Sequence, residues 1–121
     1  EGRAFGPHGK DLVIANSIDR YDDALSRELT DRAVLANIAV RDLGFKPYIA
    51  PALSSAALSI LLTLRGEWHY GSLYLGTRER GAFLGMKNRL TEGGWEWEDL
   101  DLPAELYERI RNAYENLCEI R

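Results

Sequence analysis

The 121-residue sequence is poor in the residues that build disulfides, metal centres and membrane spans. It has one cysteine, Cys118, and two histidines, His8 and His69. A single cysteine excludes an intrachain disulfide and favours a cytoplasmic setting. Two histidines far apart, with no second cysteine, lack the spacing of a metal site, so we predict no metal. No apolar run reaches the roughly 18 residues that a membrane-spanning helix needs, so no membrane association is predicted.

Recognisable catalytic and nucleotide-binding motifs are also missing. No serine lies in a glycine-flanked nucleophile elbow, and the sequence holds neither a phosphate-binding loop nor the glycine fingerprint of dinucleotide sites. Cys118, on the flank of a predicted helix, is interpreted as a small apolar group. We therefore predict no catalytic residues and no cofactor. The interpretation favours a protein that is not an enzyme.

What the sequence does contain is typical of a folded domain. Apolar residues make up 45% of the chain and charged residues 28%. A chain of this length buries roughly two-thirds of its unfolded surface, so it needs no disulfide or metal to fold. We expect residues 1–121 to form a single globular domain. Residues 1–9 hold three glycines and a proline, which predicts a flexible arm.

Helices are predicted near both ends of the chain. Apolar residues recur at three- and four-residue steps over 22–43, which predicts a long helix ending at Gly44, or two helices if it is interrupted. Residues 46–53 contain two prolines and are expected to be extended. A shorter helix is predicted over 56–64. An amphipathic helix over 102–120 is expected to close the chain, with its first turn capped by Asp101.

The middle of the chain has the two-residue alternation of β-strands. In 67–77, Trp68, Tyr70 and Tyr74 alternate with His69, Leu73 and Leu75, which predicts a strand with two distinct faces. A polar turn at 78–81 and a returning strand complete a hairpin, and a further strand follows. The predicted fold class is α+β, with an N-terminal long helix or helix pair, a three- to four-stranded mainly antiparallel sheet over about 67–100, and a C-terminal amphipathic helix over 102–120.

Charge is unevenly distributed, although the net charge is only −4. Residues 61–91 carry five basic and two acidic side chains, whereas residues 92–121 carry three basic and nine acidic ones. Two interpretations are open. The basic and acidic side chains of these regions pair with each other in the fold, or they form two oppositely charged surfaces for a partner. The favoured hypothesis is a small non-catalytic cytosolic binding protein of inhibitor, immunity or adaptor type. Its partner would be a protein, bound through an acidic tryptophan surface that consists of Trp95, Glu96, Trp97, Glu98, Asp99, Asp101 and Tyr107.

Two alternatives remain open. One is a nucleic-acid-binding domain in which a hairpin stacks bases and holds phosphates. This basic aromatic hairpin (65–89) consists of Arg65, Trp68, Tyr70, Tyr74, Arg78, Arg80, Lys87 and Arg89. The other is a small enzyme with a pocket near His69. A homodimer is plausible in each case, because the long N-terminal helix carries more apolar surface than one sheet face needs.

Overall fold

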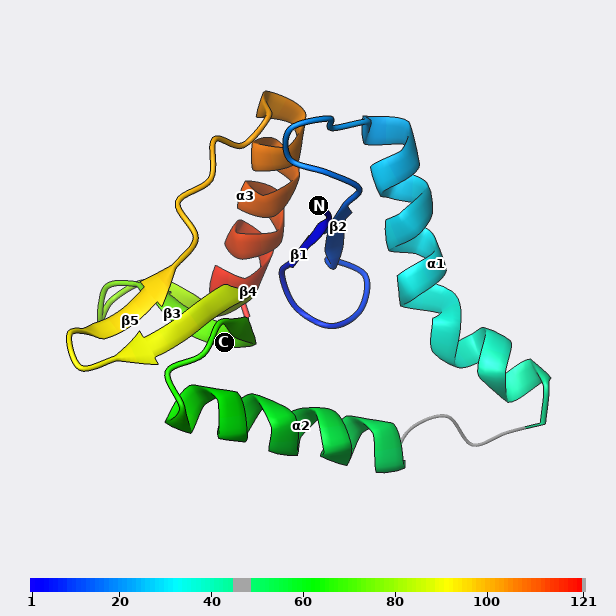
Figure 1. Cartoon of the computed structure of the whole chain (residues 1–121). Helices are drawn as coiled ribbons and strands as arrows, with labels where there is room; N and C mark the ends of the chain where they lie inside the picture. Colours follow the sequence, from blue (N-terminus) through cyan, green and yellow to red (C-terminus); the bar gives the residue numbers. More distant parts are fainter. Residues whose placement is uncertain (45–48, 121) are drawn as a thin grey trace.

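The computed structural model describes residues 1–44 and 49–120, and the side chains of all of these except 49–53. Figure 1 shows the arrangement of its helices and strands. In chain order the elements are β1 (Arg3–Phe5), β2 (Val13–Ala15), α1 (Asp23–Asp42), α2 (Ile49–Leu64), β3 (His69–Gly76), β4 (Gly81–Thr91), β5 (Gly94–Trp97) and α3 (Ala104–Cys118). The predicted α+β class is confirmed.

The first residues form part of the fold, so the prediction of an arm over 1–9 was wrong. Strand β1 pairs with β2 in an antiparallel hairpin whose register places Phe5 opposite Val13. Both side chains are buried in the core. The glycines, which had indicated an arm, turn the chain between two short strands. Glycine suits this turn because it adopts positive φ angles without steric cost.

Helix α1 is continuous and is capped by Asp22, whose Oδ1 accepts a hydrogen bond of 2.9 Å from the Leu25 amide. Its end is terminated by Gly44, which has a φ of 84° and takes the left-handed conformation that follows many helices. Ser26 and Thr30 in the first half are buried. Apolar side chains of the second half are exposed to solvent, namely Leu35, Ile38, Val40 and Leu43.

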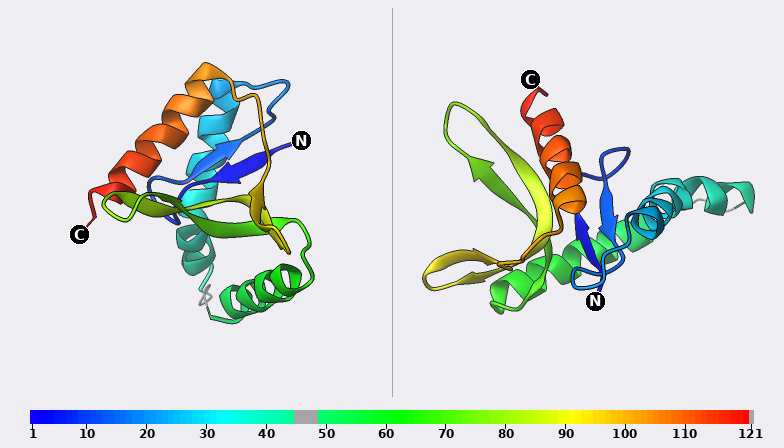
Figure 2. Two further views of the ribbon diagram at one scale, coloured as in Figure 1. Left: turned by 90° about the vertical axis from the view of Figure 1, so that its left-hand side faces the viewer. Right: turned by 90° about the horizontal axis from the view of Figure 1, so that it is seen from above.

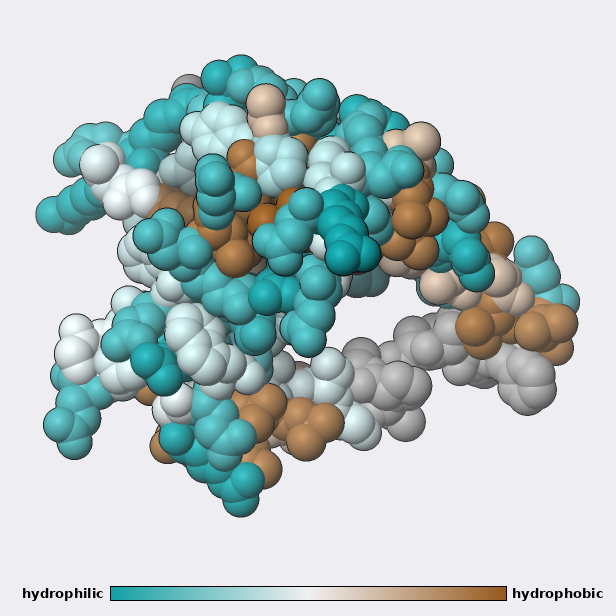
Figure 3. All heavy atoms as spheres, turned by 45° about the horizontal axis from the view of Figure 1, so that its top comes forward, coloured by the Kyte–Doolittle hydropathy of each residue, from teal (hydrophilic) through white to brown (hydrophobic). Residues whose placement is uncertain are grey.

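Helix α2 begins earlier than predicted, because residues 49–53 are helical and not extended. Pro51 is the third residue of the helix, where the backbone N–H would have no acceptor within the helix, so a proline is tolerated. The other residues of the predicted extended segment, 46–48, lie outside the described residues. No residue of α2 is charged. Apolar residues gather along α2 and near the C-terminal end of α1 (Figure 3).

Strands β3, β4 and β5 form an antiparallel sheet with β4 in the centre. The predicted alternation in β3 is confirmed, since His69 and Leu73 are 8% and 5% exposed while Tyr70 and Tyr74 are 46% and 47% exposed. Tyr74 and Phe83 are direct cross-strand partners with their rings in an edge-to-face arrangement. The sheet therefore has a covered face and a face rich in exposed aromatic rings.

Helix α3 packs against both the N-terminal hairpin and the three-stranded sheet, and β1 also contacts β4 directly (Figure 2). The helix begins at Ala104, so the predicted cap at Asp101 was wrong. Pro103 has extended backbone angles that lead into the helix, and no side chain caps it. The apolar stripe expected on this helix ran from Leu106 to Ile120; its first part is buried, whereas Ile120 is 75% exposed. The core consists of Phe5, Val13, Ala15, Leu84, Leu106, Ile110 and Ala113. Among the described residues, the helices are too short or too polar to cross a membrane.

Candidate functional site

The loop between β1 and β2 is held in a fixed turn by two glycines. Gly6 and Gly9 have φ angles of 92° and 105°, which other residues rarely adopt. The Gly6 amide donates a hydrogen bond of 3.0 Å to the Gly85 carbonyl, which joins the loop to β4. A Cβ atom on Gly6 would lie 2.8 Å from the Asp11 carbonyl oxygen, so no larger residue fits. This loop carries His8, whose side chain is exposed.

His8 lines a hollow with a volume of about 550 Å³, which we call the His8 hollow. The hollow is bounded by the β1–β2 hairpin, strands β3 and β4, and Ser55 of α2. Its volume falls within the roughly 300–1,000 Å³ of small-molecule sites. Most of its lining is apolar, with a few polar groups, a composition that is typical of such sites. The lining residues are Ala4, Phe5, Gly6, Pro7, His8, Leu12, Ser55, Tyr70, Gly71, Ser72, Gly85 and Met86.

The floor of the His8 hollow is stiffened by Asn88, which is only 1% exposed. Its Nδ2 donates to the carbonyls of Gly71 and Met86 at 2.8 and 2.9 Å, and both of those residues line the hollow. Asn88 Oδ1 has no hydrogen-bond partner in the described part of the chain. Two bonds from one buried amide hold the central strands at this point in a single geometry.

His69, which the sequence offered as the centre of an enzyme pocket, is engaged in the structure. Its Nε2 lies 3.0 Å from Thr63 Oγ1, and its Nδ1 lies 3.0 Å from the Glu67 carbonyl oxygen. The residue is 8% exposed. With both ring nitrogens bonded and little access to solvent, this imidazole joins α2 to the sheet and is poorly placed to exchange protons with a ligand.

The acidic tryptophan surface is only partly a free surface. Glu98 is held by Arg3, whose Nε and Nη2 lie 2.6 and 3.0 Å from the two carboxylate oxygens, and by Lys87 Nζ at 3.2 Å. Burial raises the pKa of Glu98, but the hydrogen bonds from Arg3 and Lys87 outweigh it, so the pKa lies below its ordinary value. Glu96 is paired with Arg89 at 2.7 Å. The remaining members of the surface, Trp95, Trp97, Asp99, Asp101 and Tyr107, are exposed.

The basic aromatic hairpin is brought together by β3 and β4, but its positive charge is largely compensated. Carboxylates lie within 4.0 Å of four of its cations, in the pairs Arg65–Glu67, Arg80–Glu115, Lys87–Glu98 and Arg89–Glu96. The Arg89 guanidinium also lies 4.7 Å from the centre of the Trp68 ring. The two charged regions of the sequence thus pair with each other, and nucleic-acid binding stays a prediction.

Sequence reasoning did not select His8. The glycines and the proline around it are typical of an arm, and two histidines far apart lack the pattern of a metal site. The signal that points to it is the pattern Gly-Pro-His-Gly at 6–9. Binding and catalytic residues are often found on loops that a rigid scaffold positions. Among the described residues, no group of three or more His, Cys, Asp and Glu residues is suited to hold a metal ion.

A scan against models of known protein families finds no match, and a search of curated proteins finds none either. Among solved structures, the chain is similar to malate dehydrogenase from Archaeoglobus fulgidus in complex with NADH. The TM-score is 0.66 with 20% sequence identity, and the match covers 97% of this chain and 41% of the other. The chain therefore spans about two-fifths of the length of that enzyme. At this identity the likeness establishes a shared fold.

Proposed function

We propose that this chain forms the substrate-facing part of a nicotinamide-dependent dehydrogenase that acts on a 2-hydroxy acid. The observation that carries the proposal is the fold likeness to malate dehydrogenase over 97% of the chain. The position of His8 at a hollow of metabolite size supports it. This proposal differs from the non-catalytic role favoured by the sequence, which gave no weight to His8.

Oxidation of a 2-hydroxy acid removes the proton of its hydroxyl group, and a group that titrates near neutral pH is suited to accept it. Imidazole is the side chain with this property. Of the two histidines, His69 is buried and bonded through both ring nitrogens, whereas His8 is exposed and lines the hollow. We therefore assign the proton acceptor to His8. The apolar walls of the hollow would strengthen its polar contacts with a bound substrate.

The described residues do not fit a nicotinamide dinucleotide. Such cofactors bind at the crossover of a parallel sheet, beside a glycine fingerprint. Both sheets of the described chain are antiparallel, and the sequence has no such fingerprint. The match leaves about three-fifths of malate dehydrogenase without a counterpart here. The proposal therefore places the cofactor, which would accept the hydride, on another segment or another chain.

Calorimetric titration with L-malate tests the substrate assignment, with succinate as the matched ligand that lacks the hydroxyl group. We expect L-malate to bind about 3- to 10-fold more tightly, the worth of one hydrogen bond to His8. The variant His8→Gln should lose most of this preference while keeping its folded circular dichroism spectrum. Equal affinity of the wild-type chain for both ligands, or an unchanged preference in His8→Gln, would contradict the proposal.

Binding of a protein partner in the cytoplasm is the second candidate function. The observation that favours it is a second, smaller hollow of about 190 Å³ with exposed aromatic rings at its rim. Tryptophan and tyrosine in such positions are typical of binding hot spots. The lining residues are Ser72, Leu73, Tyr74, Phe83, Trp95 and Trp97. The double variant Trp95→Ala, Trp97→Ala should weaken capture of a copurifying partner at least tenfold, whereas Leu25→Ala, at an exposed apolar residue of α1, serves as the control. Equal capture by both variants would argue against this surface.

A further inference from the structure

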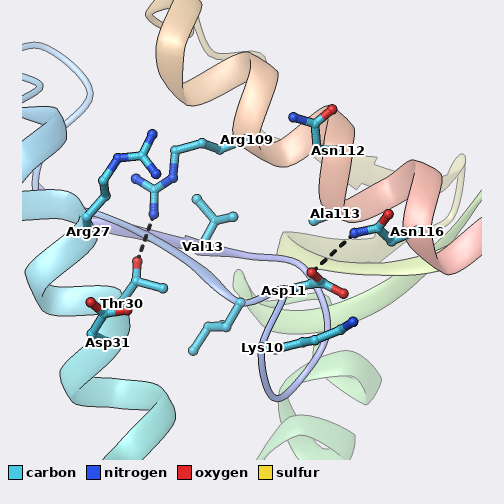
Figure 4. Close-up of a pocket in the computed structure, with 11 residues that line it drawn as sticks. Lys10, Asp11, Val13, Arg27, Thr30, Asp31, Arg109, Asn112, Ala113 and Asn116 are labelled. Atoms are coloured by element: carbon cyan, nitrogen blue, oxygen red, sulfur yellow. Dashed lines mark hydrogen bonds between the residues drawn. The ribbon is translucent and has the colours of Figure 1, made fainter.

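A polar hollow of about 330 Å³ lies between α1, α3 and the segment that leads into β2 (Figure 4). Leu12 is the only lining residue that it shares with the His8 hollow, as far as the described residues extend. Figure 4 shows Arg27 of α1 and Arg109 of α3 reaching toward each other across its wall. The lining residues are Lys10, Asp11, Leu12, Val13, Arg27, Thr30, Asp31, Arg109, Asn112, Ala113 and Asn116.

Arg109 is the most enclosed charge of this hollow, with a side chain that is 13% exposed. Its Nη1 donates to Tyr21 Oη at 3.0 Å and to Ser26 Oγ at 2.7 Å, and its Nη2 donates to Thr30 Oγ1 at 3.0 Å. All three acceptors are neutral hydroxyl groups. A guanidinium has five N–H donors. The Nε–H and the second Nη2–H of Arg109 have no acceptor among the residues that the structure describes.

Among the described residues, the two arginines share one carboxylate as their ion-pair partner. One carboxylate, Asp23, lies 2.6 Å from Arg27 Nε and 3.7 Å from Arg109 Nη1. Hydrogen bonds from Arg27 and from the Tyr21 hydroxyl lower the pKa of Asp23, so it is ionised at neutral pH. Asp23 is bonded most closely to Arg27. The enclosed guanidinium of Arg109 therefore has no carboxylate within hydrogen-bond distance among the described residues.

The rest of the lining is also polar. Asn112 and Asn116 project from α3, and Lys10 lies on the segment that leads into β2 (Figure 4). Asp11 is engaged there, since its Oδ1 accepts a hydrogen bond of 3.2 Å from Asn116 Nδ2. Together with Asp31, the lining has three cationic and two anionic side chains. Asp23 lies just outside this lining and pairs with both arginines, so the cationic and anionic side chains balance in number. What favours an anion here is the pair of open N–H donors on the enclosed Arg109.

We propose that this hollow binds a small oxyanion, a phosphate or carboxylate group, on the open donors of Arg109 with Arg27 beside it. A planar guanidinium with adjacent free N–H groups donates hydrogen bonds to two oxygens of such an anion at once. The enclosed position of Arg109 strengthens the interaction relative to a surface arginine. This site goes beyond the proposed function, because it lies apart from His8 and needs no dehydrogenase activity.

The experiment is an NMR titration of the whole chain with inorganic phosphate and, in a separate arm, with acetate, at constant ionic strength. We expect saturable shifts of the Arg109, Asn112 and Thr30 resonances, and the arm with the tighter binding identifies the anion class. Arg27→Gln should weaken binding at least about fivefold, because it removes a donor and leaves Asp23 free to neutralise Arg109. The matched control is Arg32→Gln, an exposed arginine of the same helix that lies 3.9 Å from Glu28.

A variant of opposite sign sharpens the test. Asp23→Asn removes the one carboxylate shared by the two arginines, so phosphate or acetate should bind at least about threefold more tightly. His8→Gln should leave the binding unchanged, which separates this site from the His8 hollow. Three results would overturn the proposal: shifts that do not saturate by 50 mM anion, equal effects of Arg27→Gln and Arg32→Gln, or weaker binding by Asp23→Asn.

Discussion

Helices α2 and α3 are of similar length, yet the described side chains of α2, the more apolar of the two, are the less buried. Helix α2 has 16 residues and no charged side chain, and its residues Leu58, Ile60 and Leu64 are 59%, 63% and 79% exposed. Helix α3 has 15 residues with charges along its outer side, and its Leu106 is fully buried. The comparison teaches that an apolar stripe bounded by charges defines one packing face, whereas apolar residues on all sides call for contacts beyond those in this fold.

The largest effect on the free energy of unfolding is expected from substitutions that compare the buried face of α3 with the exposed α2. Leu106→Ala opens a cavity in a fully buried position, and we expect a loss of about 3–5 kcal/mol in the free energy of unfolding. Leu61→Ala in α2, where the side chain is 41% exposed, should cost less than about 1 kcal/mol. Urea denaturation measures both. Equal losses would show that α2 is packed as tightly as α3, against the comparison.

Replacement of Arg109 should have the next largest effect. Arg109→Leu leaves the buried hydroxyl of Ser26 without its donor, takes one of two donors from the Thr30 hydroxyl, and removes the link between α3 and α1. We expect the free energy of unfolding to fall by about 2–4 kcal/mol. Arg111→Leu on the same helix is the control, because Arg111 is exposed and paired only with Glu108 three residues earlier. An equally large loss of unfolding free energy in Arg111→Leu would contradict the role of Arg109 in joining α3 to α1.

The pairing of Glu98 predicts a smaller, pH-dependent effect. Folding lowers the pKa of this carboxyl below its ordinary value of 4.5, so ionised Glu98 stabilises the fold above that value. The contribution is lost as the pH falls from 4.5 through the lower folded pKa. Glu98→Gln should cost about 1–2 kcal/mol at pH 7, where Arg3 loses its partner, and much less near pH 2. Urea denaturation at the two pH values tests this, and a loss independent of pH would contradict the sign.

The smallest effect on folding is expected on the outer side of α2. Leu58→Glu combined with Leu64→Glu should change the free energy of unfolding by less than about 1 kcal/mol, because both side chains are exposed. We expect the wild-type chain to self-associate and the double variant to be monomeric, as measured by sedimentation equilibrium. A wild-type chain that stays monomeric at 0.5 mM would contradict the expected homodimer. The apolar surface of α2 would then be assigned to a different partner.

Much of the fold was predictable because its elements have strong local signals. The alternation around Leu73 fixed the faces of β3, and the stripe from Leu106 to Ala113 identified the packing face of α3. The start of α2 was not predictable from local signals, because Pro51 indicates extended chain unless it falls within the first helical turn. Strand β1 was missed because three residues between glycines carry no periodicity.

The candidate sites were less predictable than the fold. The charges of Glu98 and Arg89 appeared as features of two separate surfaces, but ion pairing across the chain depends on strand order, which no local pattern reveals. His8 becomes a candidate site residue only in the folded chain, where it lines one hollow with Tyr70 and Met86. These residues are more than 60 positions away from it in the sequence. Arg109 likewise meets Ser26 only through tertiary packing.

The central proposal is that His8, and not His69, faces a bound 2-hydroxy acid. The chain has only these two histidines, so their imidazole NMR signals report on the two positions without ambiguity. The account predicts that addition of L-malate shifts the ring signals of His8 in a saturable way and leaves those of His69 in place. Unchanged His8 signals at saturating L-malate, or equal shifts of both histidines, would contradict it.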